Sequence, residues 1–490
     1  MYCKSALRLK RAFFTRFSLR MKPFETVTPA LIAALQSALG AECVHVDEET
    51  LALCASDETE DLVFTPEVVV TPRDSAGIAA VMKLAAKHRV PVTPRGAGTG
   101  LSGGALAVHG GIVLSTRALN RILEIDTTNL MAVVEPGVIT QVFQEAVEAE
   151  GLFYPPDPAS RGSCFLGGNL AECSGGPRAV KYGVTKDFVT GIEAVLANGE
   201  VIRHGGKLLK NVTGYNLTQL LIGSEGTLGV ITKIYFRLLP LPRHRLLLLI
   251  PYDTLEACAR TVPAIMHAGI IPSALEFMER DAIEIAERHL HKPFPNAGAA
   301  AQLLIEIDGN DEAAIARDAE RITEIALAEG ATDVLAADTP TRMGELWALR
   351  RSLGVAVKSE SVYKEEDTVV PRANLVALLL GVKAIALRHG IRTVCYGHAG
   401  DGNLHVNILK MEMSDETWNN GLPPMIREIF ELTVALGGMI SGEHGIGWVQ
   451  KAYVPIALSP AELGVMRAIK NALDPEGILN PGKIFPDEAI

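Results

Sequence analysis

Cysteine is scarce in this sequence of 490 residues, and its few positions are scattered. The chain has seven cysteines, an odd number spread between Cys3 and Cys395. This spacing excludes the kind of disulfide framework that staples small secreted domains, so a reducing, cytoplasmic compartment is expected. No C-x-x-C-x-x-C run occurs either, and the chain therefore has no recognisable iron–sulfur cluster of its own.

Long apolar runs and excess positive charge are also lacking. The densest apolar run, Leu246–Ile250, is bounded by Arg245 and Pro251, whereas a membrane-spanning helix needs about 20 apolar residues. The 46 lysines and arginines are outnumbered by 57 aspartates and glutamates, which gives a formal net charge of −11. This balance argues against a nucleic-acid partner, because such a partner requires a basic face.

Residues 1–27 differ from the rest of the chain in being basic. Seven lysines and arginines precede the first acidic residue, Glu25, with three phenylalanines among them. Two interpretations stay open. The segment is a transit peptide or membrane-surface arm, which would add a peripheral location at the inner membrane, or it results from an upstream start codon and Met21 is the true first residue.

The length predicts two or three packed units, and 48% apolar residues suffice for their cores. The first elements expected are a helix over 28–39 and a strand over 67–71. A helix capped by Ser75 follows, with apolar residues at helical spacing, and then a strand over 90–93. Strand, helix and strand in this order predict a βαβ unit.

The pattern changes after Pro242, where we place a domain boundary. Strand-like runs now alternate with helices rich in alanine and glutamate. The strands are expected at Leu246–Pro251 and Leu303–Ile307, and the helices at 253–268, 311–329, 375–387 and 460–473.

A glycine-rich loop, Pro94–Gly104, follows the strand over 90–93. Glycines let successive backbone N–H groups converge on an anion, and Thr99 and Ser102 add hydroxyl donors, so the loop suits a dinucleotide diphosphate. It is not a Walker loop, because G-x-x-x-x-G-K-[ST] is absent. It is not a Rossmann fingerprint either, because its glycines do not open onto a helix with an acidic residue about 20 positions on. Further glycine- and proline-rich segments make a mere tight turn a poor explanation; they lie at 155–158, 167–169, 174–176 and 223–229.

With these segments the chain resembles the vanillyl-alcohol-oxidase flavoproteins, in their D-2-hydroxy acid dehydrogenase branch, from about residue 28 to the end. The motifs are R-G-x-G-T-G-x-S-G-G at 95–104, E-P-G at 135–137, G-S-C-x-x-G-G-N at 162–169, S-G-G at 174–176 and G-S-E-G-T-L-G-V-I-T at 223–232. The resemblance implies an α+β protein. A PCMH-type FAD-binding domain of two α/β subdomains would span 28–242. A substrate domain with an antiparallel sheet and helices would span 243–440, and a segment over 441–490 would return to the FAD site.

The resemblance also implies how FAD is bound. Covalent members place a histidine in the first loop where this chain has Thr99, so FAD is expected to be non-covalent. At the positions of Phe165 and Cys173, some relatives have other residues beside the flavin. This difference is expected to affect the fine tuning of the flavin, such as its redox potential, rather than its binding. The residues expected to bind FAD are Arg95, Gly96, Ala97, Gly98, Thr99, Gly100, Ser102, Gly103, Pro156, Asp157, Gly162, Gly167, Gly168, Asn169, Ser174, Gly175, Gly176, Gly226, Ile231 and Asn480.

A second constellation lies near the C-terminus. His398 precedes a Gly-Asp-Gly turn, and the alternation that follows places His405 and Asn407 on one face of a strand. Glu443 and His444 come later, framed by glycines. Two imidazoles and a carboxylate suit a divalent, zinc-like ion with open positions for substrate. The alternative is that these histidines only satisfy buried polar groups.

The resemblance makes His398, His405 and Glu443 the metal ligands and His444 the general base. A 2-hydroxy acid would chelate the metal, His444 would take the hydroxyl proton, and the hydride would pass to the flavin. Segments that carry carboxylate ligands in relatives match Arg350 and Lys364 here, while Arg351 is expected to face solvent.

The expected function is therefore FAD-dependent oxidation of glycolate or D-lactate to the 2-oxo acid. Gly354 stands where D-2-hydroxyglutarate dehydrogenases have a threonine, which disfavours a dicarboxylate. The alternatives are such a dehydrogenase, an oxygen-using sugar or alcohol oxidase, and a non-catalytic FAD-binding subunit of a glycolate oxidase complex. Electrons would leave to a quinone, a cytochrome or a separate iron–sulfur subunit, and a homodimer or hetero-complex is expected.

Overall fold

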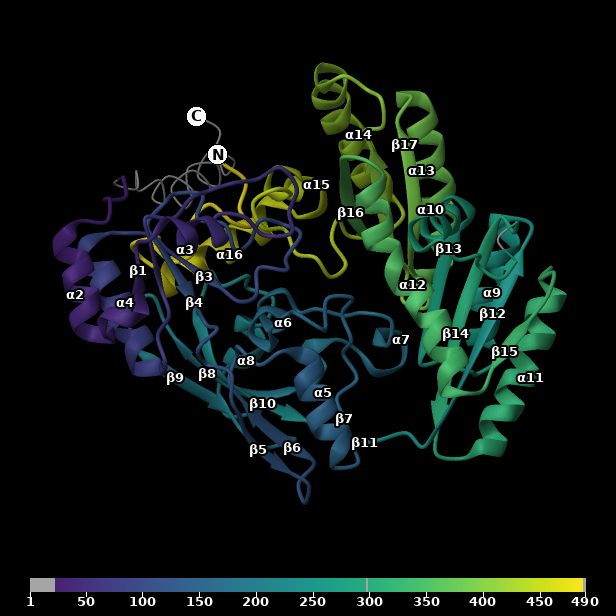
Figure 1. Ribbon diagram of the computed structural model, residues 1–490, viewed down its shortest axis with the longest axis horizontal. Coiled ribbons are helices and arrows are strands. Elements are labelled where there is room, and N and C mark those ends of the chain that lie inside the picture. The colour runs from purple at the N-terminus through teal and green to yellow at the C-terminus, as the bar shows by residue number, and fades with distance from the viewer. Residues whose placement is uncertain (1–22, 297, 488–490) are drawn as a thin grey trace, which may run out of the picture.

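The computed structural model describes residues 23–296 and 298–487, so most of the basic segment predicted over residues 1–27 lies outside the described residues. Figure 1 shows two lobes side by side. The first lobe contains residues 23–240 together with 459–487, and the second contains 244–440. Each lobe combines helices with β-sheet, which confirms the α+β class.

The first lobe begins with a four-stranded sheet in the order β1 (Val44–His45), β2 (Val68–Val70), β4 (Ile112–Ser115), β3 (Val92–Arg95). Strands β2 and β3 both pair in parallel with β4, so the predicted βαβ unit has a third strand inserted at its centre. Helices α2 (Pro29–Leu39) and α4 (Ser75–His88) pack on this sheet through a shared apolar core. The cap of α4 differs from expectation, because the Asp74 side chain accepts the hydrogen bond from Gly77 and Ser75 is the first helical residue.

An antiparallel five-stranded sheet completes this lobe, in the order β5 (Ile122–Asp126), β6 (Met131–Val134), β10 (Val230–Arg237), β8 (Val189–Val195), β9 (Val201–Gly205). Helices α5 (Thr140–Ala149), α6 (Leu166–Glu172) and α8 (Leu217–Leu221) contribute to its core. A two-stranded sheet pairs β7 (Leu152–Phe153) with β11 (Leu239–Pro240) just before the chain enters the second lobe. The remaining short helices here are Ala41–Cys43, α3 (Glu48–Leu53), α7 (Ala179–Tyr182) and Thr185–Asp187.

The second lobe contains one antiparallel sheet of seven strands. Their order is β15 (Leu335–Ala337), β12 (His244–Tyr252), β14 (Ala301–Gly309), β13 (Ala274–Glu279), β17 (Arg392–His398), β18 (Asn403–Leu409), β16 (Tyr363–Val369). One face packs on α9 (Leu255–His267), α11 (Glu312–Ala328), α13 (Leu375–His389) and α14 (Asp415–Ala435). The other packs on α10 (Arg280–Leu290) and α12 (Pro340–Glu360).

Helix α12 lies where the second lobe faces the first (Figure 1). The sheet therefore presents its α12 side, and the end of the β17–β18 hairpin, toward the first lobe.

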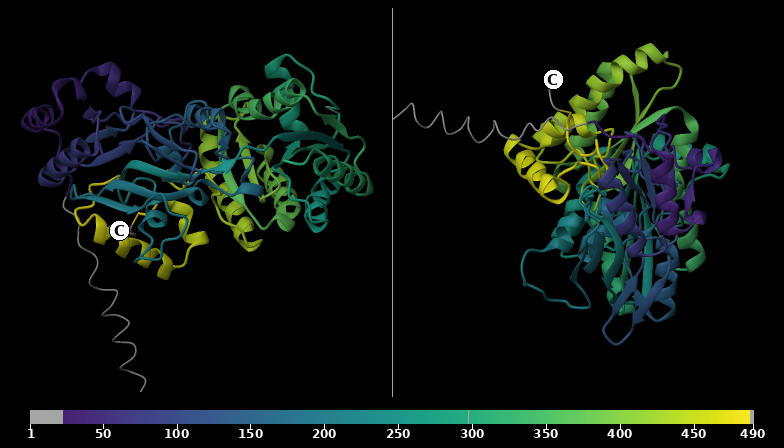
Figure 2. Two further views of the ribbon diagram at one scale, coloured as in Figure 1. Left: turned by 90° about the horizontal axis from the view of Figure 1, so that it is seen from below. Right: turned by 90° about the vertical axis from the view of Figure 1, so that its left-hand side faces the viewer.

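The C-terminal segment returns to the first lobe, as Figures 1 and 2 show. The helix Lys451–Tyr453 and α15 (Val454–Ala457) still pack on the core of the second lobe, and α16 (Pro460–Leu473) then packs on the first lobe. Leu479 forms a parallel bridge with Val92, and both Ile478 and Leu479 are fully buried in the core of the first sheet. Within the described residues, no helix is long and apolar enough to cross a membrane.

Candidate active site

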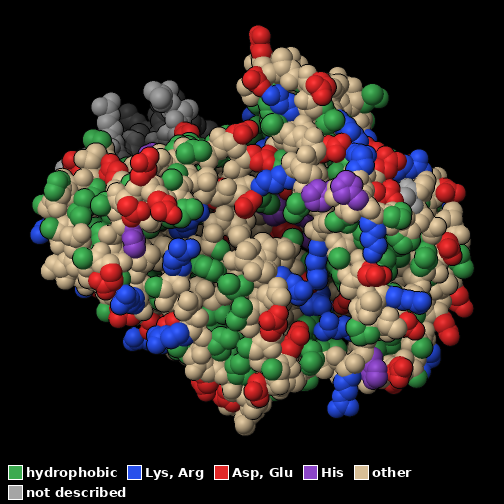
Figure 3. All heavy atoms as spheres, in the orientation of Figure 1, with side chains coloured by type: hydrophobic (Ala, Val, Ile, Leu, Met, Phe, Trp, Pro, Cys, Tyr) green, Lys and Arg blue, Asp and Glu red, His purple; other side chains and the backbone are tan. Residues whose placement is uncertain are grey.

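A cavity of about 480 Å³ lies between the lobes and is lined by residues of both. Figure 3 shows the molecule hollowed at this place, with basic side chains gathered beside the hollow. The first lobe contributes the loop after β3, the start of α6 and the loop before β10, while the second contributes α12, β16, β17 and β18. The glycine segments and the histidine constellation, which lie far apart in sequence, thus share one cavity.

Most of the residues predicted to bind FAD line this cavity. They are Arg95, Gly96, Ala97, Gly98, Thr99, Gly100, Asp157, Gly167, Gly168, Asn169, Ser174, Gly226 and Ile231. A β-carbon added at Gly100 or Gly168 would meet no atom within 4 Å, which places open space directly over the backbone there. A cofactor can therefore approach the main chain at these glycines, as a diphosphate or a ring requires.

The other predicted residues do not line the cavity. The backbone carbonyl of Ser102 accepts hydrogen bonds from Trp448 and Val449, and the Asn480 amide donates to the carbonyls of Gly104 and Glu225. These contacts tie the C-terminal segment to the glycine loops. The remaining members of this set, whose positions are likewise outside the lining, are Gly103, Pro156, Gly162, Gly175 and Gly176.

The two histidines of the H-x-x-x-x-x-x-H motif face each other across the β17–β18 hairpin. His398 pairs with Asn403 in the ladder, and the rings of His398 and His405 lie 5.3 Å apart between centroids. One carboxylate oxygen of Glu443 lies 3.2 Å from Nε2 of His398 and 3.7 Å from Nε2 of His405. The ligand atoms of these three residues all lie within 4.8 Å of one another, so a single ion could contact all three.

Each histidine has a second carboxylate on its opposite ring nitrogen. Nδ1 of His398 lies 2.8 Å from Glu276 on β13, and Nδ1 of His405 lies 3.2 Å from Glu365 on β16. A carboxylate that holds Nδ1–H orients the ring and leaves Nε2 free as a metal ligand. Sequence reasoning missed both glutamates, because they come from strands far from the motif.

The charges of this cluster stabilise one another. Burial opposes charge on His398, but the carboxylates of Glu276 and Glu443 outweigh burial and hold the pKa of His398 well above its usual value. Burial would likewise raise the pKa of Glu443, yet His398 and His405 lower it to about 2. Glu443 is therefore ionised at neutral pH, as a metal ligand must be.

A buried carboxylate, Asp367 on β16, fixes the loop that carries Glu443 and His444. Its Oδ2 accepts backbone N–H groups of Gly442, Glu443 and His444 at 2.8, 2.7 and 2.8 Å. Its Oδ1 accepts a hydrogen bond of 2.6 Å from the Asn403 amide. Although burial would raise the pKa of Asp367, nearby His444, His405 and these donors lower it below the usual range.

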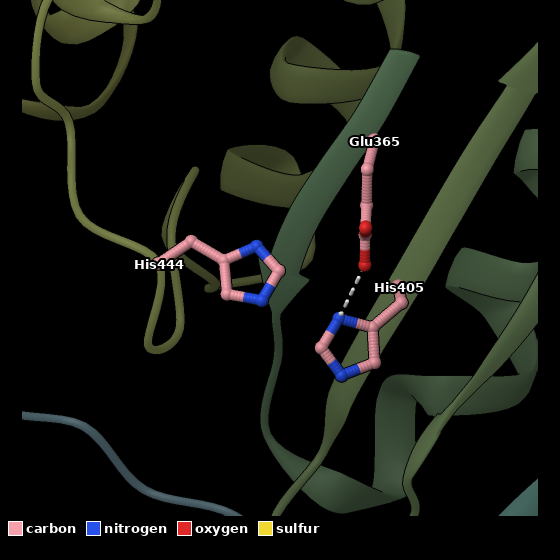
Figure 4. A group of neighbouring side chains, drawn as sticks. All are labelled: Glu365, His405 and His444. Atoms are coloured by element: carbon pink, nitrogen blue, oxygen red, sulfur yellow. Dashed lines mark ion pairs between the residues drawn. The ribbon is translucent and has the colours of Figure 1, made fainter. Parts of the chain in front are cut away.

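His444 stacks on His405, with ring centroids 5.2 Å apart, and Figure 4 shows it approaching from a loop while Glu365 and His405 come from neighbouring strands. Burial opposes charge on His444, but Asp367, Glu365 and Glu443 raise its pKa. These acids make the imidazole a better proton acceptor at the edge of the cavity.

The predicted cations occupy different places. Arg350 lines the cavity over the Tyr396 ring, with a terminal nitrogen 2.6 Å from Glu276. Arg351, expected to face solvent, also lines the cavity and lies 3.8 Å from Asp157. Lys364 does not line it, because strand alternation turns Tyr363 and Glu365 toward the cavity and Lys364 to the opposite face of β16.

A second carboxylate, Glu225 of the 223–232 motif, holds the loop from the first lobe. It accepts the N–H groups of Ile446 at 2.8 Å and Gly447 at 2.6 Å. The segment 441–447 is thus clamped on one side by Asp367 and on the other by Glu225. The 223–232 motif includes Glu225, but no local sequence pattern signals that Glu225 or Asp367 contacts this loop.

Comparison with known proteins gives matches along most of the chain. Residues 66–205 match the family model described as an FAD binding domain, and residues 241–484 match that of the FAD linked oxidases, C-terminal domain. The chain is 42% identical to glycolate oxidase subunit GlcD of Bacillus subtilis, over 88% of this chain and 92% of that protein. It is 39% identical to D-lactate dehydrogenase of Anaerostipes hadrus, over 86% of this chain and 89% of that protein.

Solved structures show the same fold at lower identity. p-Cresol methylhydroxylase with substrate bound superposes with a TM-score of 0.77 at 17% identity, covering 95% of this chain and 99% of that one. The overall fold is thus shared with a protein whose sequence is very different.

Proposed function

The chain belongs to the family of FAD-linked oxidoreductases that contains the glycolate oxidase subunit GlcD and D-lactate dehydrogenase, and from this premise we propose that it oxidises a small D-2-hydroxy acid to the 2-oxo acid. The observation that carries the proposal is the shared cavity. Its first-lobe wall is formed by the glycine segments and its second-lobe wall by His398, His405, Glu443 and His444. Glycolate and D-lactate are the substrates named by these relatives' own names and fit a site of this chemistry.

The glycine segments are suited to hold FAD, bound without a covalent link because Thr99 occupies the position of a covalent histidine. Open space over Gly100 and Gly168 is the feature of the structure that fits such a cofactor. When bound, FAD supplies the acceptor for the hydride that leaves the carbinol carbon.

His398, His405 and Glu443 are suited to hold a divalent ion, with zinc favoured by two imidazoles and one carboxylate. The fit rests on the Nε2 atoms, which both face Glu443, since Glu276 and Glu365 lie on the Nδ1 sides. Such an ion supplies Lewis acidity that lowers the pKa of the substrate hydroxyl.

The protein's own side chains do the remaining work. His444 accepts the hydroxyl proton on its ring nitrogen, held in place by the Asp367 clamp on its backbone. Arg350 and Arg351 present cationic groups to the cavity for the substrate carboxylate, and guanidinium groups bind carboxylates in pairs of hydrogen bonds.

We further propose that the chain works as a subunit beside an electron-acceptor partner. Relatives with GlcD in their name are described as subunits, and the seven scattered cysteines give no cluster motif on this chain. The acceptor would be a quinone, a cytochrome or an iron–sulfur subunit.

Anaerobic reduction of the bound flavin tests the proposal. Glycolate or D-lactate added to FAD-loaded, metal-replete protein should bleach the flavin absorbance. If no 2-hydroxy acid bleaches it, the proposed function is wrong.

A further inference from the structure

Side chains of opposite charge line the part of the cavity that the second lobe forms, where the substrate is proposed to bind. Arg350 and Arg351 on α12 form a cationic wall, and Glu365 on β16 forms an acidic one. The Glu365 side chain is 12% exposed and this exposed part faces the cavity, since the residue is part of its lining. From this geometry we infer that Glu365 determines substrate specificity by excluding 2-hydroxy acids with a second carboxylate, a conclusion that rests on the function proposed above.

The position of Glu365 follows from the register of β16. Glu365 pairs with Asn407 and Asp367 with His405, so the strand turns Tyr363, Glu365 and Asp367 toward the histidine side of the sheet. Lys364, the one lysine of this stretch, faces the other way and does not line the cavity. The cavity is therefore lined here by an anion, Glu365, and not by Lys364, the cation that could bind a distal carboxylate.

His405 lies 3.2 Å from Glu365 and offsets part of its charge, but no free lysine among the residues that line the cavity adds to this. Lys358 at the mouth of the cavity is already bound to Glu58 at 2.6 Å. Gly354 has only Tyr396 Oη near the place of a β-carbon, at 3.5 Å, so this part of the wall offers space and a neutral hydroxyl but no cation. A substrate that places its 2-carboxylate at the arginines would bring a second carboxylate toward Glu365, where two like charges repel.

The substrate class that fits is a monocarboxylic 2-hydroxy acid with a short, uncharged side chain. For such an acid the carboxylate meets Arg350 and Arg351, and a hydrogen or methyl group lies in the space beside Gly354 and Tyr396. This class contains glycolate and D-lactate and leaves out D-2-hydroxyglutarate.

The test is a ratio of kcat/KM values, measured by flavin reduction with D-2-hydroxyglutarate and with D-lactate at one ionic strength. The wild type should prefer D-lactate about a hundredfold or more, and E365Q should shift the ratio about tenfold toward the dicarboxylate. The ratio separates specificity from a structural role, because damage to His405 would lower both rates together.

E366Q is the matched control. Glu366 lies next to Glu365 on the same strand, but it is buried on the opposite face and accepts a hydrogen bond from Gln450 at 2.8 Å. Its replacement should leave the ratio unchanged. An equal ratio for E365Q and wild type, or a wild type that uses both acids equally well, would overturn the inference, whereas flavin that no 2-hydroxy acid reduces would overturn the proposed function itself.

Discussion

At the scale of the residue, Glu276 connects two parts of the site. One carboxylate holds both Nδ1 of His398 at 2.8 Å and a terminal nitrogen of Arg350 at 2.6 Å. It is fully buried, so its charge is not screened by water. Glu276 therefore orients a proposed metal ligand and a proposed substrate ligand together.

We predict that E276Q weakens metal binding about 10- to 100-fold, because an amide no longer favours the ring orientation that frees Nε2. Titration of the apoprotein with zinc would measure this change. E279Q is the control, since Glu279 lies on the same strand and is also buried but contacts Lys383 at 2.6 Å instead of a histidine. Equal zinc affinity of E276Q and E279Q would contradict the prediction.

Asp367 provides a second prediction at this scale. The D367N change removes the charge that holds three consecutive N–H groups of the 442–444 loop and should lower kcat/KM about 100-fold as Glu443 and His444 lose their positions. It should also reduce the free energy of unfolding by about 2–3 kcal/mol. Flavin-reduction kinetics and denaturant unfolding would measure the two effects.

The control for D367N is D415N, an exposed carboxylate of the same lobe at the start of α14. It should leave kcat/KM within about twofold of the wild type. A D367N protein as active as D415N would show that the clamp is not needed.

The site residues that lie in short motifs were predicted from the sequence, but the residues that hold them in place were not. His398, His405, Glu443 and His444 stand in short glycine-framed patterns that local spacing reveals, and the structure brings them into one cavity. Glu276 contacts His398 across 122 positions of sequence, and such a contact depends on strand order. Lys364 was predicted to bind the substrate carboxylate, but strand register turns its neighbour Glu365 toward the cavity instead.

At the scale of the element, helix α4 shows how closely a sequence specifies the residue at which a helix begins. Asp74 adopts extended backbone and accepts the Gly77 N–H at 2.8 Å, whereas Ser75 is already helical. Aspartate and serine both favour the N-cap position, so the sequence alone does not decide which of these two neighbours caps the helix. The apolar face at Ile78, Val81 and Met82 was predicted correctly, since its periodicity is local.

D74A should therefore destabilise the first lobe by about 1 kcal/mol, and S75A by a few tenths at most. The shift in the denaturant midpoint of the first-lobe transition, followed by flavin fluorescence, would measure both. A larger shift for S75A than for D74A would show that the cap is misassigned.

The same limit applies to the sheets. After Pro242, strands β12 and β14 and helices α9, α11, α13 and α16 follow apolar periodicity and were predicted within a few residues. The 21-residue helices α12 and α14 and the strands β13, β15, β16 and β17 were not predicted, and neither was the order of the strands. The insertion of β4 between β2 and β3, and of β14 between β12 and β13, depends on contacts between distant segments. Such pairings leave no periodic pattern in the sequence.

At the scale of the whole molecule, the site depends on how the lobes are held together. Asp308 on β14 accepts hydrogen bonds from Lys181 at 2.5 Å and from the Tyr182 hydroxyl at 2.9 Å, both in α7 of the first lobe. Arg178 beside them lies 3.7 Å from Asp157 of its own lobe and 3.7 Å from Glu306 of the other. This buried polar contact fixes one side of the cavity.

We predict that D308A lowers the free energy of unfolding by about 3 kcal/mol, because it leaves Lys181 partly buried without its carboxylate. Hydrogen exchange of the α7 amides should speed up in the same variant. E320A, an exposed change on α11 of the same lobe, should alter neither quantity. Unchanged α7 exchange in D308A would mean that other contacts hold the lobes.

The central claim is that FAD and the His398, His405, Glu443 group act on one substrate in one cavity. Anaerobic stopped-flow reduction of the flavin by D-lactate or glycolate tests it most directly, in protein stripped of metal and then given back zinc. The account predicts that stripping abolishes reduction, that zinc restores it in the wild type, and that zinc fails to restore it in H405A, which should still bind FAD. Flavin reduction that is equally fast in stripped protein and in H405A would contradict the account.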